Sequence, residues 1–178
     1  MTVFISGGVK NGKSFHAQRS AKILADGGAL YYIATMIPHD SEDDARIARH
    51  LREREGWGFQ TIECPVNIMD CTKKGDVNGA FLLDSVTALL ANEMFRSDGS
   101  FDANAPVRVA NELKEFAKSV KNAIFVSDFI FSDAGHYDEY SEAYRRGLAL
   151  CDRALCEVCD SVLEICSGTV TVHKGEAI

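Results

Sequence analysis

The chain has 178 residues, of which 46% are hydrophobic and 25% are charged, and its formal net charge is −7. This length and composition predict a single globular domain spanning residues 1–178, large enough to bury a sizeable core. The negative charge argues against broad binding to nucleic acids or anionic membranes, because such surfaces need concentrated lysine and arginine. No apolar segment approaches the roughly 18 residues that a membrane span needs, so we expect a cytoplasmic protein without one.

Strand-like and helix-like segments alternate along the chain. Apolar runs with high β propensity predict strands at residues 2–6, 30–34, 59–62, 81–83 and 124–127. Periodic patterns predict helices at residues 13–25, 42–55, 85–95, 107–120 and about 138–159. Loops rich in turn-forming residues are expected at 37–41, 64–78 and 97–106. This alternation is typical of an α/β fold, with a mostly parallel sheet flanked by helices.

The end of the chain has a different pattern. Residues 162–166 and 170–173 are strand-like and flank the short segment Ser-Gly-Thr at 167–169. A glycine in so short a connection is typical of a hairpin. We therefore expect an antiparallel hairpin at one edge of the sheet.

The strongest motif follows the first predicted strand. Residues 7–14 fit G-x-x-x-x-G-K-[ST] between an apolar strand and a helix, which is the context of a phosphate-binding loop. Backbone N–H groups would surround the phosphates, the Lys13 ammonium would neutralise them, and the Ser14 hydroxyl would ligate Mg²⁺. The alternative, a chance glycine-rich turn, would need neither lysine nor hydroxyl at these offsets. The residues predicted to bind a nucleoside triphosphate here are Gly7, Gly8, Val9, Lys10, Asn11, Gly12, Lys13 and Ser14.

Ligands of an open α/β sheet bind at the carboxyl ends of its strands. The polar residues at these ends are Ser6, Thr35, Glu63, Asp84 and Asp128. Asp84 ends an apolar strand, and a carboxylate in this position is typical of the Mg²⁺ site of phosphate-loop enzymes. Asp84 could instead belong to the cap of the helix that begins at Ser85. Beside a phosphate loop, we favour the metal site.

The predicted helix 42–55 places Arg46, His50 and Arg54 on one face, because residues four apart share a helix face. Neighbouring positive charges should lower the pKa of His50 and keep its imidazole neutral, the form that acts as a nucleophile. The alternative is a solvated face with ion pairs such as Glu42 with Arg46. The residues alone leave both interpretations open.

Several segments of the first half carry a resemblance to a known family. Besides residues 7–14, they are 32–35 (Tyr-Ile-Ala-Thr), 46–50 (Arg-Ile-Ala-Arg-His), 61–63 (Thr-Ile-Glu) and 82–87 (Leu-Leu-Asp-Ser-Val-Thr), with Trp57 and Asn92. In order and spacing they resemble the adenosylcobinamide kinase / adenosylcobinamide-phosphate guanylyltransferase family of cobalamin biosynthesis. The resemblance implies a P-loop NTPase-like fold and a homotrimer.

The resemblance also implies two reactions on a small corrinoid acceptor, with GTP or ATP and Mg²⁺. In the family, the histidine that matches His50 attacks the α-phosphate of GTP and passes GMP to adenosylcobinamide phosphate. The same enzymes phosphorylate adenosylcobinamide. By this resemblance Lys13, His50 and Asp84 would be catalytic, and Ser14 and Asp84 would hold the metal. Further nucleotide contacts are expected from Thr35, Arg46, Leu51, Arg52, Glu53, Arg54, Glu63 and Asp84.

The second half departs from the family at residues 127–135. Phe129 stands where the family has a glutamate, and Phe131 and Asp133 stand where it has glycines. A loop without these glycines brings its backbone less close to a ligand. The two rings fit either core packing or contact with a large flat ligand. Two alternatives therefore stay open: a divergent GTP-binding homologue that acts on another acceptor, and a non-catalytic nucleotide-binding module.

Overall fold

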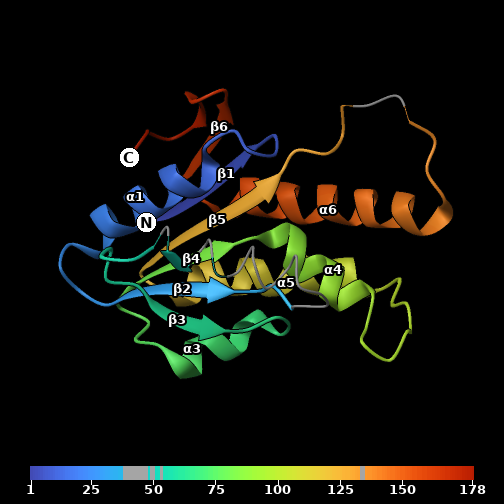
Figure 1. Ribbon diagram of the computed structural model, residues 1–178, viewed down its shortest axis with the longest axis horizontal. Coiled ribbons are helices and arrows are strands. Elements are labelled where there is room, and N and C mark those ends of the chain that lie inside the picture. Colours follow the sequence, from blue (N-terminus) through green and yellow to red (C-terminus); the bar gives the residue numbers. More distant parts are fainter. Residues whose placement is uncertain (38–47, 49–50, 53, 133–134) are drawn as a thin grey trace.

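The computed structural model describes residues 1–37, 48, 51–52, 54–132 and 135–178 of the chain. Within these residues, one seven-stranded sheet has the order β3-β2-β4-β5-β1-β6-β7 (Figure 1). Its strands are β1 (Thr2–Gly7), β2 (Leu30–Ala34), β3 (Gln60–Glu63), β4 (Ala80–Asp84), β5 (Asn122–Asp128), β6 (Ser161–Cys166) and β7 (Thr169–Lys174). All neighbours pair in parallel except β6 and β7, which are antiparallel. The predicted α/β fold and its antiparallel edge are confirmed.

Helices cover both faces of the sheet. Their bounds are α1 (Lys13–Ala25), η1 (Ile68–Asp70), α3 (Cys71–Lys74), α4 (Val86–Met94), α5 (Ala105–Ser119) and α6 (Glu139–Val158). On one face, α1 packs with Val3 and Ile5 of β1 in one apolar cluster. On the other face, Phe4 of β1 belongs to the larger cluster that includes residues of α4, α5 and α6. Alternate residues of one strand therefore serve two separate cores, as the two-residue period of a strand requires.

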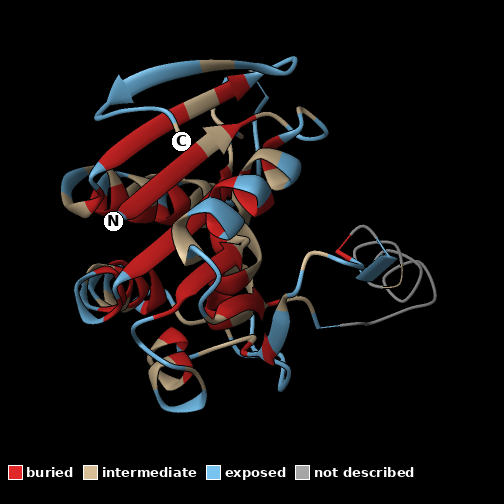
Figure 2. Cartoon of the chain, turned by 90° about the vertical axis from the view of Figure 1, so that its left-hand side faces the viewer, coloured by how far each residue is buried: buried red, intermediate tan, exposed pale blue. Residues whose placement is uncertain are grey.

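Burial follows the position of each strand in the sheet. The central strands β1, β4 and β5 are buried over most of their length, as Figure 2 shows in red. The edge strand β3 buries only Ile62, and β7 is largely exposed. Continuous apolar runs are typical of strands covered on both faces, whereas an edge strand keeps solvent contact. Among the described residues, no helix has the length and apolarity to cross a membrane.

Two predicted loops prove to contain helical residues. The predicted loop 64–78 contains η1 and α3, which have three and four residues. Such short helices contain too few positions to show a helical period, so the pattern missed them. The predicted loop 97–106 ends too late, because α5 begins at Ala105 and has Pro106 in its first turn. Proline is well suited to that position, since the first helical residues need no N–H partner within the helix.

The predicted helix 42–55 lies largely outside the described residues. Of its described part, Ala48, Leu51 and Arg52 are helical, and residues 54–56 form a turn. The predicted helix 85–95 corresponds to α4, which begins one residue later. Ser85 is its N-cap, because the Ser85 hydroxyl accepts a hydrogen bond from the Ala88 amide at 3.3 Å.

Candidate nucleotide-binding site

The phosphate loop lies between β1 and α1, at the carboxyl end of the sheet's centre. At Gly7, a Cβ atom would lie 2.2 Å from the Ile165 carbonyl oxygen of β6, so only glycine allows the two strands to approach this closely. Gly12 has a φ of +89°, a conformation that favours glycine, and it directly precedes α1. Having no side chain, Gly12 does not cap the first-turn N–H groups of α1. The loop therefore presents a helix N-terminus, which suits an anion.

The Lys13 side chain folds back over the phosphate loop. Its Nζ donates a hydrogen bond to the Gly8 carbonyl oxygen at 2.7 Å and lies 2.9 Å from Asp128 Oδ1. The side chain is only 7% exposed. A buried ammonium held by two oxygens is already oriented for a phosphate, which can take over one of these contacts.

Asp128 is the site residue whose importance the sequence did not reveal. It was recognisable as the polar end of a strand, but nothing in the sequence places that strand beside β1. In the sheet β5 is the neighbour of β1, and Asp128 lies opposite Gly7 in the register. The Phe129 amide also donates to the Gly7 carbonyl oxygen at 2.8 Å. The sheet order therefore creates the contact between Asp128 and Lys13.

The outer part of the loop is fastened to the hairpin at the end of the chain. The Asn11 side-chain oxygen accepts a hydrogen bond from the Ser167 amide at 3.2 Å, in the turn between β6 and β7. Val9 is 68% exposed, and Lys10 has a φ of +60° at the tip of the loop. The C-terminal hairpin thus supports the phosphate loop, whereas Val9 and Lys10 face solvent.

Asp84 ends β4, which lies two strands from β1 in the sheet. Its backbone carbonyl oxygen accepts a hydrogen bond from the Tyr32 hydroxyl at 3.4 Å. Burial raises the pKa of Tyr32, and the nearby Asp84 carboxylate raises it further. The guanidinium carbon of Arg54 lies 3.5 Å from the centre of the Tyr32 ring, and Arg54 is only 8% exposed. Tyr32 therefore brings Arg54 to the strand end that carries Asp84.

Ser14 and Asp84 carry oxygen donors of the kind that Mg²⁺ takes when it is shared with a nucleotide. Among the described residues, no group of three or more histidine, cysteine or acidic side chains is arranged to hold a metal. Mg²⁺ does not need such a group, because it commonly combines one or two protein oxygens with phosphate oxygens and water. Ser14 supplies a hydroxyl in the first turn of α1, and Asp84 supplies a carboxylate. This donor set suits Mg²⁺ only when the phosphates of a nucleotide are also present.

Thr35 and Glu63 lie at different distances from the phosphate loop. Thr35 is buried, and its hydroxyl accepts a hydrogen bond from the Ser85 amide at 3.3 Å, which ties the end of β2 to the end of β4. Glu63 is exposed at the end of β3, four strands from β1. At about 4.8 Å per strand that separation is roughly 19 Å. The sheet order therefore keeps Glu63 away from the phosphate loop.

The remaining predicted contacts lie between residues 46 and 54. Leu51 and Arg52 are exposed and line, with Arg54 and Phe59, a cavity of about 600 Å³. The predicted residues Arg46, His50 and Glu53 lie outside the described residues.

Three features define a P-loop NTPase-like protein. They are a glycine loop after a central strand, a buried lysine at the start of the next helix, and an aspartate at the end of a nearby parallel strand. The P4 protein from bacteriophage phi6, solved in complex with ADP, shares the fold with a TM-score of 0.51 and 14% sequence identity. That match covers 96% of this chain and 52% of the P4 chain.

Within this class, residues 3–172 match the CobU family, described as cobinamide kinase / cobinamide phosphate guanyltransferase, and the chain belongs to that family. The bifunctional adenosylcobalamin biosynthesis protein CobU of Salmonella typhimurium strain LT2 is 32% identical over 104 residues. The protein of the same description from Escherichia coli K12 is 33% identical over 105 residues. Each match covers 57% of this chain and 55% of the relative, so the chain spans about half the length of the curated relatives it matches.

Proposed function

We propose that this chain phosphorylates adenosylcobinamide with a nucleoside triphosphate and transfers GMP from GTP to adenosylcobinamide phosphate. Membership of the CobU family over residues 3–172 is the observation that carries the proposal. The two CobU relatives, both described as bifunctional, support the pairing of two activities. By the resemblance of its motifs, we further propose that the protein is a cytoplasmic homotrimer.

In the kinase reaction, the phosphate loop holds the triphosphate. The acceptor's hydroxyl oxygen forms a bond to the γ-phosphorus and releases its proton to solvent. The bond from the γ-phosphorus to the β,γ-bridging oxygen breaks, and the nucleoside diphosphate leaves. Lys13 stabilises the charge on the β- and γ-phosphates, and Asp128 orients the Lys13 ammonium. Mg²⁺, held by Ser14, Asp84 and the phosphates, would neutralise charge on the leaving group. This reaction gives His50 no covalent step.

In the guanylyl transfer, an imidazole nitrogen of His50 forms a bond to the α-phosphorus of GTP. The bond to the α,β-bridging oxygen breaks, and pyrophosphate leaves. A phosphate oxygen of adenosylcobinamide phosphate then attacks the same phosphorus, which breaks the phosphorus–nitrogen bond and regenerates the imidazole. Two successive transfers keep the high group-transfer potential of the donor in the intermediate and predict ping-pong kinetics.

Arg54 supports the position proposed for this histidine. It follows His50 by four residues in the sequence, and its guanidinium is buried against Tyr32 beside the end of β4. A guanidinium near the α-phosphate would steady the charge that develops there during the transfer. Arg54 is therefore a candidate for that contact, and His50 precedes it by four residues in the sequence.

The proposal is tested with Mg²⁺ and GTP labelled at the α-phosphate. We expect acid-labile covalent label on the wild type and none on His50→Ala, while kinase activity of His50→Ala with γ-labelled nucleotide stays near the wild-type level. His136→Ala is the matched control, because His136 is exposed and outside the proposed site. Equal labelling of the wild type and His50→Ala would contradict the assignment of His50. Loss of both activities in a folded His50→Ala protein would contradict the division between the two reactions.

A divergent homologue with another acceptor is the second candidate. The observation that favours it is the changed segment after β5, where Phe129 and Phe131 replace the glutamate and the glycine of the family pattern. Label that forms on His50 but does not pass to adenosylcobinamide phosphate would support this candidate. GTP binding without label or turnover would support a non-catalytic module instead.

A further inference from the structure

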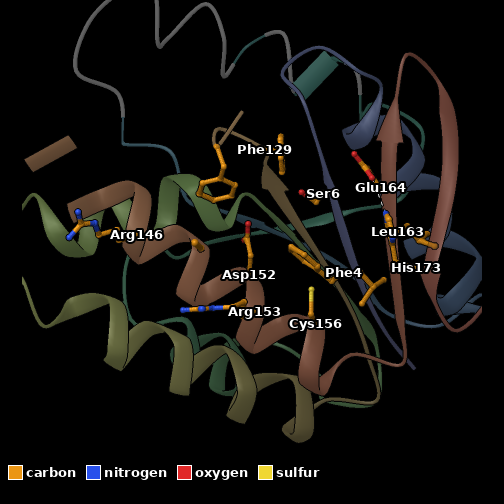
Figure 3. A pocket seen from close by; sticks show the side chains of 13 residues that line it. Phe4, Ser6, Phe129, Arg146, Asp152, Arg153, Cys156, Leu163, Glu164 and His173 are labelled. Carbon is orange, nitrogen blue, oxygen red and sulfur yellow. Dashed lines mark hydrogen bonds and ion pairs between the residues drawn. The ribbon is translucent and has the colours of Figure 1, made fainter. Parts of the chain in front are cut away.

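A cavity of about 620 Å³ lies between α6 and the strands β1 and β6 (Figure 3). It is on the side of the sheet away from α1, because Phe4 of β1 lines it and belongs to the cluster on the α6 side. Apolar walls come from Phe4, Ala149, Val162 and the changed loop after β5. A cavity of this size is within the range of sites for small molecules.

The two phenylalanines of the changed loop form one wall of this cavity. Phe129 is 44% exposed, and its ring meets the ring of Phe131 edge to face at 5.5 Å between centroids. Both side chains line the cavity. Phe129 therefore borders an open pocket, whereas Phe131 both lines the pocket and packs against the core on the α6 side. Exposed aromatic rings in a concave site supply a large apolar contact area for a flat ligand.

The cavity adjoins the phosphate loop directly. Ser6, which lines it, immediately precedes Gly7 in β1. Phe129 immediately follows Asp128, the partner of Lys13, and its amide is bonded to the Gly7 carbonyl oxygen at 2.8 Å. A molecule in this cavity would thus lie next to phosphates held by the loop. That is the arrangement that transfer from a nucleotide to an acceptor requires.

The polar groups of the cavity suit a ligand with hydrogen-bonding edges. The Asp152 side chain points away from α6 in Figure 3, and burial raises the pKa of its carboxyl to about 7. The nearby Asp128 carboxylate adds to this rise. A carboxyl that keeps its proton near neutral pH can donate a hydrogen bond to an amide carbonyl. Glu164 and His173 pair with each other at 2.8 Å, and Arg146 and Arg153 add positive charge along α6.

We propose that this cavity is the acceptor site and binds the corrinoid of adenosylcobinamide, with an apolar face of the ring against Phe129 and Phe131 and an amide edge toward Asp152. A corrinoid combines a broad apolar macrocycle with amide groups at its periphery, which matches both walls. The inference rests on the proposed function and specifies where its acceptor binds. It also gives the changed loop a purpose: the aromatic rings provide ligand contact where the family pattern has a glutamate and a glycine.

The test measures adenosylcobinamide binding by equilibrium dialysis, read from the visible absorption of the corrin ring. Phe129→Ala removes an aromatic wall, and Ala149→Trp fills the cavity from α6. Phe95→Ala is the matched control, because Phe95 is also 44% exposed and does not line the cavity. Binding of a fluorescent GTP analogue is measured on each protein in parallel.

We expect Phe129→Ala and Ala149→Trp to weaken corrinoid binding at least ten-fold, with nucleotide binding unchanged and Phe95→Ala equal to the wild type. If Ala149→Trp fails to fold, Phe129→Ala still decides, because Phe129 is 44% exposed and belongs to neither buried core cluster. Wild-type corrinoid affinity in both variants would overturn the acceptor site but leave the proposed function standing. Nucleotide binding without any corrinoid binding to the wild type would overturn the proposed function and this site together. A changed oligomeric state of Ala149→Trp with unchanged corrinoid affinity would assign the cavity to a subunit contact instead.

Discussion

The two faces of β1 differ in how completely they are covered. On one face, Val3 and Ile5 pack against α1, where Ala17 and Ala21 are fully buried. On the other face, Phe4 is buried but Ser6 is only partly so, and the cavity beside α6 remains open. Small side chains allow a helix to lie close to a sheet, so the α1 face is filled. The face that is not filled is the one that adjoins the phosphate loop and offers room for an acceptor.

The two faces of β1 therefore have different roles. The α1 face fixes the position of the phosphate loop, because the strand before the loop and the helix after it are packed together. The α6 face leaves a cavity that the loop after β5 borders with two aromatic rings. The residues that carry the resemblance to the family lie mainly before residue 93. They therefore concern the phosphate loop more directly than the cavity beside α6. The acceptor side is where this chain differs from the family pattern.

The largest expected effect concerns Lys13 on the filled side. Lys13→Ala should weaken nucleoside triphosphate binding at least a hundred-fold, because it removes the buried ammonium that would neutralise the β- and γ-phosphates. Isothermal titration calorimetry with GTP and with ATP measures the effect. Lys22→Ala, an exposed lysine on the same helix, should bind like the wild type. Near-unchanged affinity of Lys13→Ala would remove the phosphate-loop assignment.

The second prediction compares the two faces of β1 by replacing an alanine of the helix on each side with leucine. Ala17→Leu should lower the free energy of unfolding by about 1–3 kcal/mol, because no space exists between α1 and the sheet. Ala149→Leu should cost less than about 1 kcal/mol, because its added atoms enter the cavity. Urea denaturation measures both. Similar losses would mean that the two faces are equally filled, contrary to the structure.

The third prediction concerns the buried carboxyl of Asp152. Its carboxyl has a pKa of about 7, against 3.8 for the ordinary group, so the folded protein holds a proton that the unfolded chain releases. Stability should therefore fall as the pH rises from about 4 to 7, by about 3 kcal/mol at roughly 1.4 kcal/mol per pKa unit. Asp152→Asn cannot ionise and should lack this component. Urea denaturation at pH 5 and pH 8 measures it, and parallel pH profiles of the two proteins would contradict the raised pKa.

Local pattern predicted most of the elements correctly. The central strands are continuous apolar runs, and α1, α5 and α6 are long enough to show a helical period, so neighbouring residues contain the information. Short elements do not show such a period, which is why η1 and α3 were predicted as a loop. At the site, the motif located the phosphate loop, and the apolar run before Asp84 placed that residue at a strand end. Their roles in binding nucleotide and metal stay predictions.

Sequence by itself determined the phosphate loop, the alternation of strands and helices, and the family resemblance, because each depends on residues close together in the chain. Only the tertiary structure decided that β5 lies beside β1, which brings Asp128 to Lys13, and that Glu63 ends a distant edge strand. Strand order depends on which apolar faces pack together across the whole domain, so no local pattern specifies it. The same holds for the cavity: Phe129 and Phe131 were ambiguous as residues, and the placement of α6 opposite β1 and β6 decided that both line a pocket, with Phe131 also packed against the core.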